Sequence, residues 1–235
     1  FTWQGGEPML RGLDFYRRVV ALQKKHAKPG QRIENDLQTN GVLIDEEWAA
    51  FLKEHRFLVG LSIDGPREIH DHYRINKGGA PTFDKVMAAA RLLRKAGVAF
   101  NTLTCVHRFN ARRPLDVYRF LRSELDSRTI QFIPIVQIKG FETTAPGKWD
   151  ASRLPVLGSP QARPGAPDSI VTDWSVDPDD YGYFLSRVFD EWLRKDIGRV
   201  LVNHIETLVS QHAGLGSQMC IYNEFCGKGV AIEHD

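Results

Sequence analysis

The chain has 235 residues, of which 42% are hydrophobic and 26% charged, a composition typical of a folded globular protein. Its formal net charge of +2 is too small to favour nucleic acid or an anionic membrane surface as a partner. No apolar run approaches the roughly 20 residues that a membrane-spanning helix needs. Residues 1–3 also lack the basic and apolar regions of a signal peptide. We therefore expect neither nucleic acid nor a membrane as a partner.

The chain ends and the cysteines suggest a piece of an intracellular protein. The first residue is not methionine, residues 1–3 resemble the end of a buried strand, and residues 229–235 stop in an unfinished strand and turn. We therefore expect a fragment that lacks both ends. Its three cysteines form no disulfide framework, and an odd count suits a reducing compartment, the cytoplasm.

Strand-like and helix-like segments alternate from the start, which predicts a parallel sheet with helices packed outside it. The expected elements, in chain order, are strands at 1–3, 32–39, 57–63, 98–106 and 129–136, and helices at 13–26, 46–52, 83–96 and around 117–121. Thr82 is the expected N-cap of the third helix. The polar stretch from Asp64 to Thr82 is expected to be a connection, with His70-Asp71-His72 in a hydrogen-bonded loop.

Five strand–helix repeats in residues 1–137 is the density of an α/β barrel, although an open doubly wound sheet has the same local pattern. Proline and glycine interrupt the alternation at residues 138–175, which predicts an insertion or linker. Helices are expected again from Asp177-Pro178 and at 203–212. We therefore divide the chain into residues 1–137, 138–175 and 176–235.

Polar residues follow successive predicted strands, and in a barrel these strand ends form the active face. Gly5 and Gly6 let a backbone approach a ligand closely, while the Glu7 carboxylate can hold an ammonium group or the turn itself. A plain strand-to-helix turn explains the same residues equally well. Further strand-end residues are Gln38 to Gly41, Ser62, Asp64 and His107, and Gln131 lies inside an otherwise apolar strand.

These motifs, in this order, closely resemble those of the radical S-adenosylmethionine (radical SAM) enzymes. They are Gln4-Gly5-Gly6-Glu7-Pro8, Gln38-Thr39-Asn40-Gly41, Ser62-Ile63-Asp64-Gly65-Pro66 with Ile69-His70-Asp71 and Arg74, the run 131–136, and residues 219–234. Within that superfamily the chain is most similar to the anaerobic sulfatase-maturating enzymes, which carry a C-terminal SPASM domain with auxiliary iron–sulfur clusters. The resemblance implies a partial (β/α)6 barrel, here without its first strand and cluster loop, followed by the start of a SPASM domain.

The resemblance also implies the cofactor-binding residues. Gln4, Gly5, Gly6 and Glu7 match the loop that holds the methionine amino group of S-adenosylmethionine. Asn40 and Ser62 match strand-end positions near the cofactor, with Ser62 at its carboxylate or ribose, and Asp64 shapes the turn.

Arg74 is an expected partner for the cofactor carboxylate, because a planar guanidinium group can donate two parallel hydrogen bonds to a carboxylate. A solvated surface arginine is the alternative.

For metal, the resemblance implies that Cys220 and Cys226 are ligands of an auxiliary [4Fe-4S] cluster. From their spacing alone they could be paired ligands, a zinc half-site with His234, or unrelated residues. Spacing alone favours unrelated residues, because two ligands do not make a tetrahedral site. Gln137 departs from the acidic residue frequent in relatives. Cys105, within a predicted strand, is expected to be a buried apolar-like residue.

Two further parts of the family's machinery are expected outside this chain. The resemblance implies that the three cysteines of the SAM-binding cluster precede Phe1. It also implies that the catalytic base, an aspartate, lies beyond Asp235, the last residue. We therefore expect no catalytic residue within the chain itself.

The implied function is a radical SAM oxidoreductase that converts a cysteine or serine of a sulfatase polypeptide to Cα-formylglycine, with flavodoxin or ferredoxin as electron donor. This activity is expected of the full-length parent, because the fragment lacks the first cluster's ligands. One alternative is a related maturase that crosslinks a ribosomal peptide. Another is a catalytically silent, truncated binding protein.

Overall fold

The computed structural model describes residues 1–140, 154–156, 158–217, 219–225 and 229–232. Its centre is a six-stranded parallel sheet with the order β1-β2-β3-β4-β5-β6. The strands are β1 Thr2–Trp3, β2 Asp36–Thr39, β3 Leu58–Ser62, β4 Phe100–Val106, β5 Thr129–Pro134 and β6 Leu201–Val202. A doubly wound sheet reverses its strand order at a switch point, whereas a barrel wall keeps chain order. The predicted α/β partial barrel is therefore confirmed, and the doubly wound alternative is wrong.

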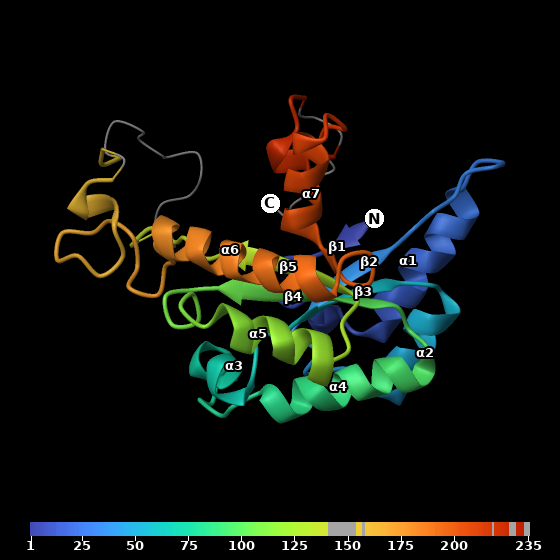
Figure 1. The fold of residues 1–235 in the computed structure, drawn as a ribbon. Helices are drawn as coiled ribbons and strands as arrows, with labels where there is room; N and C mark the ends of the chain where they lie inside the picture. Colours follow the sequence, from blue (N-terminus) through green and yellow to red (C-terminus); the bar gives the residue numbers. More distant parts are fainter. Residues whose placement is uncertain (141–153, 157, 218, 226–228, 233–235) are drawn as a thin grey trace.

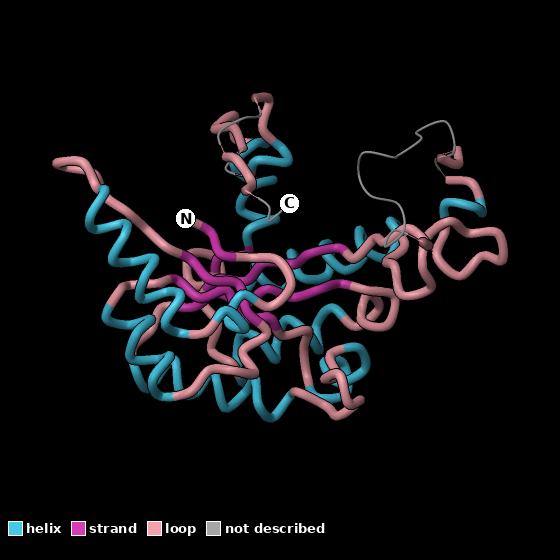
Figure 2. The backbone as a smooth tube through the Cα atoms, turned by 180° about the vertical axis from the view of Figure 1, so that it is seen from behind, coloured by secondary structure: helices cyan, strands magenta, loops and turns pink. Residues whose placement is uncertain are grey.

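Right-handed crossovers between strands in chain order place the connecting helices on one face of a sheet. The helices are α1 Leu13–His26, α2 Glu46–Glu54, α3 Arg67–Tyr73, α4 Phe83–Ala96, α5 Pro114–Arg119, α6 Pro178–Lys195 and α7 Asn203–His212. Figures 1 and 2 show α2 to α5 on one side of the sheet and α7 standing on the other side. None of the helices in the described ranges is long and apolar enough to cross a membrane.

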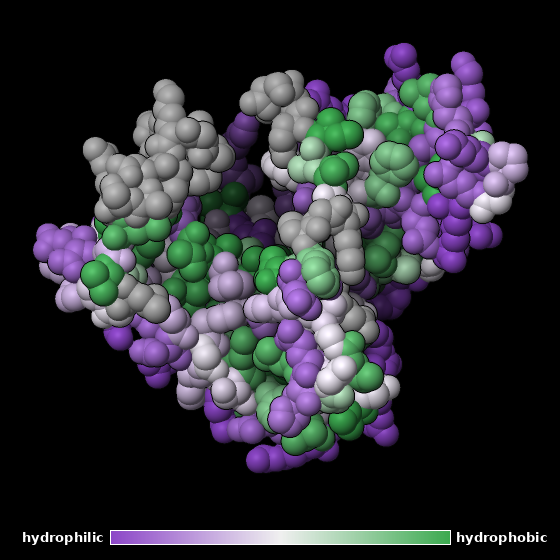
Figure 3. All heavy atoms as spheres, turned by 90° about the horizontal axis from the view of Figure 1, so that it is seen from above, coloured by the Kyte–Doolittle hydropathy of each residue, from purple (hydrophilic) through white to green (hydrophobic). Residues whose placement is uncertain are grey.

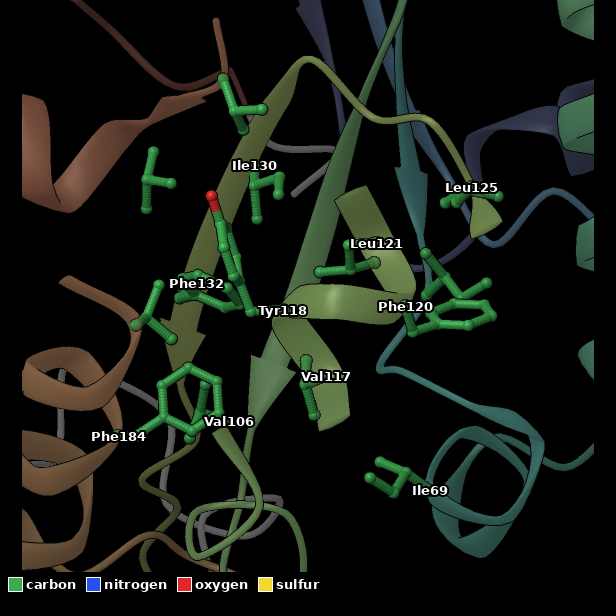
Figure 4. Packing of buried hydrophobic residues seen from close by; sticks show 14 of the residues in the cluster. Ile69, Val106, Val117, Tyr118, Phe120, Leu121, Leu125, Ile130, Phe132 and Phe184 are labelled. Carbon is green, nitrogen blue, oxygen red and sulfur yellow. The ribbon is translucent and has the colours of Figure 1, made fainter. Parts of the chain in front are cut away.

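The core fills the space between the sheet and these helices. Leu61, Ile130 and Phe132 project from the strands into one cluster that also contains Tyr118 and Phe184. Figure 4 shows Ile130, Phe132, Tyr118 and Phe184 meeting between β5, α5 and α6. Each buried aliphatic or aromatic side chain of this kind contributes about 1.5–3 kcal/mol to stability. The helix face of the sheet is therefore its stabilising face, and the opposite, inner face is free for polar side chains.

One local expectation is wrong and a second is only partly right. The segment with His70, Asp71 and His72 is the helix α3, not a loop, because Ile69 and His70 pack inward from its single buried side. Thr82 occupies the expected N-cap position of α4, but its side chain makes no capping hydrogen bond. The Asp71 carboxylate accepts the N–H groups of Thr82 and Phe83 instead (3.0 and 2.9 Å).

The sheet also extends beyond the boundary predicted at residue 137. The two-residue strand β6, which was not expected, pairs with β5, and α6 packs against α5. In the segment between β5 and α6, backbone hydrogen bonds join residues 135–139 to residues 170–176. The described part of the predicted insertion therefore returns to the end of β5. Residues 178–202 thus complete the sheet layer. The three-part division of the chain stays a prediction.

We expect substitution of Leu61 by alanine to lower the free energy of unfolding by about 2–5 kcal/mol, because the side chain is 0% exposed and leaves a cavity. Leu58 lies on the same strand but is 39% exposed, so Leu58→Ala is the matched control, with a change within about 0.5 kcal/mol. Urea unfolding of both variants measures the difference. Equal losses of unfolding free energy in the two variants would contradict the assignment of Leu61 to the helix face and Leu58 to the inner face of the sheet.

Candidate functional site

The turn after β1 lies at the edge of the sheet where the parallel strands end. Gly5 and Gly6 have φ values of +92° and +51°, a region that glycine adopts without strain. A Cβ added at either position would meet no atom within 4 Å, so backbone conformation, not crowding, requires glycine here. Both residues are exposed, and their peptide groups are open to a ligand.

Glu7 fixes this turn to the next strand. Its Oε1 accepts hydrogen bonds from the Met9 N–H (3.1 Å) and the Thr39 hydroxyl (2.8 Å), and its Oε2 accepts one from the Asn40 N–H (2.8 Å). One carboxylate thus joins the ends of β1 and β2. Of the two roles expected for Glu7, the structure shows that it holds the turn; binding of an ammonium group stays a prediction.

Gln4 and Asn40 flank the Glu7 clamp. The Asn40 Oδ1 accepts the Val42 N–H (2.9 Å), which leaves the side-chain amide nitrogen as its outward-facing donor. The Gln4 side chain is exposed and makes no hydrogen bond within the described ranges. Both residues therefore lie at the same strand-end edge as Glu7 and offer amide groups to a ligand.

The register of the strands identifies the residues of the inner face. Two of its rows are Gln38–Gly60–Asn101 and Ser62–Leu103–Gln131. A Cβ at Gly60 would lie 2.7 Å from Cδ1 of Leu103, so the close approach of that side chain requires glycine. Ser62 and Gln131 are half-buried, and their side chains bind no partner among the residues described. Seen from above, the surface is hollowed near its middle (Figure 3).

Asp64 and Arg74 form a bidentate ion pair just beyond the end of β3. The Nε and Nη2 of Arg74 donate to the two carboxylate oxygens of Asp64 (2.6 and 3.0 Å), and the Cys105 N–H donates to Oδ1 (2.8 Å). The Arg74 and Asp64 side chains are 23% and 3% exposed. The solvated-surface alternative for Arg74 is therefore wrong. Asp64 shapes its turn, but its carboxylate is enclosed by these donors rather than open to a cofactor.

Burial alone would lower the pKa of Arg74, but the charge and hydrogen bonds of Asp64 raise it overall. Arg74 therefore stays charged at neutral pH. Its Nη1 is the one guanidinium nitrogen with no hydrogen bond to the described residues. An anion can still bind there, so carboxylate binding by Arg74 stays a prediction.

Cys105 lies on the inner face and is half-buried, so the expectation of a buried, apolar-like cysteine is met only in part. Its sulfur accepts a hydrogen bond from Nη2 of Arg74 (3.3 Å). Burial, followed by the nearby Asp64 charge, raises the pKa of the Cys105 thiol to about 11. Cys105 is therefore a neutral thiol at neutral pH, which is unreactive as a nucleophile.

A cavity of about 440 Å³ opens above the ion pair, at the ends of β3, β4 and β5. A second hollow, of about 640 Å³, lies over the turn at residues 4–8. Both volumes are in the range of small-molecule sites. Sequence reasoning assigned no site role to three residues of the first cavity, Tyr73, Ile135 and Trp174. Tyr73 lies in a short helix and Trp174 in a loop, whereas Ile135 belongs to the predicted strand 129–136 but lies just after the observed end of β5 at Pro134.

Two buried histidines lie beside the ion pair. His70 is 0% exposed and His107 is 2% exposed, and both ring nitrogens of His107 are buried without a hydrogen-bond partner in the described structure. Burial lowers the pKa of each to about 4. Both imidazoles are therefore neutral at pH 7.

The metal prediction is only partly accessible to the structure. Cys220 is exposed at the start of a short 3-10 helix, Cys220–Tyr222, whereas Cys226 lies outside the described residues. The described ranges contain no group of three or more metal-binding side chains. A [4Fe-4S] cluster does not fit the described residues alone, and the ligand roles of both cysteines stay predictions.

The catalytic base is likewise beyond what the structure describes. The base was expected after Asp235, and residues 233–235 lie outside the described residues. A base beyond Asp235 therefore stays a prediction.

A family profile described as the Radical SAM superfamily matches residues 1–121, more than half of the 235 residues. The chain belongs to the radical SAM superfamily. The matched region contains the glycine turn, Ser62, the ion pair and both buried histidines.

Individual relatives are more specific. The chain is 40% identical over 233 residues to the serine-type anaerobic sulfatase-maturating enzyme of Bacteroides thetaiotaomicron, covering 99% of this chain and 53% of that enzyme. It is 37% identical over 241 residues to the cysteine-type enzyme of Clostridium perfringens, covering 100% and 57%. The structure of native anSMEcpe with bound AdoMet and Cp18Cys peptide has 36% identity and a TM-score of 0.76, covering 94% and 54%. The chain spans about half the length of the curated relatives it matches.

We predict that His107 makes stability depend on acid pH. Its folded pKa, about 4, lies below its ordinary value of 6.5, so the unfolded state binds more protons between these values. The free energy of unfolding should therefore fall as pH drops from about 6.5 towards 4, by up to about 1.4 kcal/mol per pH unit for this histidine. Urea unfolding of the parent and of His107→Leu across this range should give a smaller slope for the variant. Parallel curves would refute the prediction.

Proposed function

We propose that the protein containing this chain binds S-adenosylmethionine at the carboxyl edge of the sheet and oxidises a cysteine or serine of a sulfatase polypeptide to Cα-formylglycine. The observation that carries the proposal is similarity to sulfatase-maturating enzymes of both target types over essentially the whole chain. The similar anSMEcpe structure holds both AdoMet and a peptide. The strand-end site described above supplies groups of the matching chemistry.

The described residues fit the methionine part of S-adenosylmethionine. The open peptide groups of Gly5 and Gly6 can accept hydrogen bonds from its ammonium group. The Ser62 hydroxyl and Nη1 of Arg74 are unpaired donors in the described structure, as a carboxylate requires. Gln4 and Asn40 add amide groups at the edge. Glu7 and Asp64 hold this frame through the hydrogen bonds that already engage them.

S-adenosylmethionine and its [4Fe-4S] cluster supply the radical chemistry of this superfamily when they are bound. The described residues alone do not fit a cluster. The contribution of this chain is to orient the cofactor on a rigid sheet edge and to hold the target β-carbon near it. Its thiol, Cys105, is protonated at neutral pH and so does not act as a base there.

We further propose that residues beyond α7 begin an auxiliary-cluster domain in which Cys220 and Cys226 are ligands. The exposed position of Cys220 leaves its thiol free to coordinate a metal. Flavodoxin or ferredoxin is the proposed electron donor. We place the protein in the cytoplasm, where its thiols and clusters stay reduced.

The substrate proposal predicts a defined product. Anaerobically reconstituted complete protein, given S-adenosylmethionine and a reductant, should convert a sulfatase-motif peptide to one whose mass matches the aldehyde. Paired peptides with cysteine or serine at the target position identify the preferred residue, and an alanine peptide is the control. Cleavage of the cofactor with no change in either peptide would overturn the substrate assignment and leave the superfamily intact.

The cofactor site predicts a second result. Ser62→Ala removes one unpaired donor, so the dissociation constant for S-adenosylmethionine should rise about twofold to tenfold, the effect of one hydrogen bond. Ser186→Ala is the matched control, because that hydroxyl bonds only to the Gly182 carbonyl oxygen within α6. Equilibrium dialysis of the complete protein measures both. An unchanged constant for Ser62→Ala would remove Ser62 from the site.

A further inference from the structure

The ion pair of Asp64 and Arg74 rests on a buried chain of hydrogen bonds through His70. Nε2 of His70 lies 3.0 Å from the Thr82 hydroxyl, and its Nδ1 lies 3.4 Å from the Asp64 backbone nitrogen. The Thr82 hydroxyl in turn donates to the Arg74 carbonyl oxygen (2.7 Å). The His70 imidazole thus contacts the Asp64 backbone directly and the Arg74 backbone through Thr82. The His70 carbonyl oxygen also accepts the Arg74 N–H at the end of α3 (2.9 Å).

The directions of these bonds select one state of the imidazole. A threonine hydroxyl has a single proton, and Thr82 gives it to the Arg74 carbonyl, so its oxygen accepts from Nε2–H of His70. Nδ1 then carries no proton and accepts the Asp64 N–H. Only the neutral Nε2–H form satisfies both partners.

The chain of bonds closes into a ring. The Arg74 guanidinium returns to the Asp64 carboxylate, and the Cys105 N–H fixes the same carboxylate to β4. Asp64 and Arg74 are therefore joined twice, once by their side chains and once by their backbones through His70 and Thr82. An exposed arginine would lose side-chain and backbone freedom on binding an anion, whereas this one is already ordered.

We propose that His70 is a positioning residue for cofactor binding: through Thr82 it fixes the backbone of Arg74, so that Nη1 is presented at the cavity above the ion pair. This inference rests on the proposed function, because it assigns the cofactor carboxylate to Arg74. The role differs from packing. An apolar residue of similar size could fill the space beside Phe83, but it could not hold Thr82 and the Asp64 N–H together.

Two substitutions separate the two bonds of His70. His70→Gln places an amide nitrogen near the position of Nε2 and should keep the bond to Thr82. His70→Leu loses both bonds. We expect the dissociation constant for S-adenosylmethionine, measured by equilibrium dialysis on the complete reconstituted protein, to rise about fivefold to tenfold in His70→Leu and less than about twofold in His70→Gln. The kcat at saturating cofactor should change little in either variant.

Thr82 gives an independent route to the same bond if His70→Leu does not fold. Thr82→Val keeps the shape but lacks the hydroxyl, so it should weaken binding as His70→Leu does, while Thr82→Ser should bind normally. The double variant His70→Leu/Thr82→Val should bind S-adenosylmethionine no more weakly than the weaker-binding single variant. The two substitutions break the same hydrogen bond, so their effects should not add.

The outcomes distinguish this inference from the proposed function. If the parent protein binds S-adenosylmethionine and folded His70→Leu and Thr82→Val bind it equally well, His70 is a structural residue only and the positioning role is overturned. If kcat falls while binding is unchanged, the role is overturned as well. If the parent itself shows no binding, the proposed function fails, and the inference fails with it.

Discussion

Parallel pairing of the strands in chain order is the constraint on which the site depends. It directs every strand end to one edge, so residues as distant in sequence as Gly5, Ser62 and His107 belong to one face of the molecule. The same pairing separates the tasks of the two faces. Apolar side chains such as Leu61 and Phe132 stabilise the helix side. Polar residues on the inner side can therefore remain unpaired without weakening the core.

Charge burial imposes the second constraint. A buried ion pair contributes little net stability, since desolvation offsets the attraction, but removal of one partner is costly. Asp64 and Arg74 are thus better explained by geometry than by stability. Among the residues described, the pair leaves one guanidinium nitrogen unbound while every other polar atom of the two side chains has a partner. Such an arrangement prepares a single direction of approach for an anion, with little further ordering on binding.

Periodicity was sufficient for the long elements and failed for the short ones. The helices at 13–26 and 83–96 and the strand 57–63 have clear apolar patterns. The structure contains both helices at these bounds and the strand one residue shorter at each end. α3 has only Ile69 and His70 buried, and β6 has two residues, too few to show a period. The residues of the site were recognisable from motif order, but the pairing of Asp64 with Arg74 depends on tertiary structure. The cap of α4 by Asp71, eleven residues before Thr82, depends on it too.

The location of this network within the chain has a physical consequence. Every bond of the Glu7 clamp and of the ring through His70 joins residues between 7 and 105, on strands β1 to β4 and the helices that cover them. None needs the segment after 137, the helix α7 or the late cysteines. The frame that we propose for the methionine part of the cofactor is therefore determined by the first four strands of the sheet and their connections. It does not depend on the segments proposed to provide metal ligands.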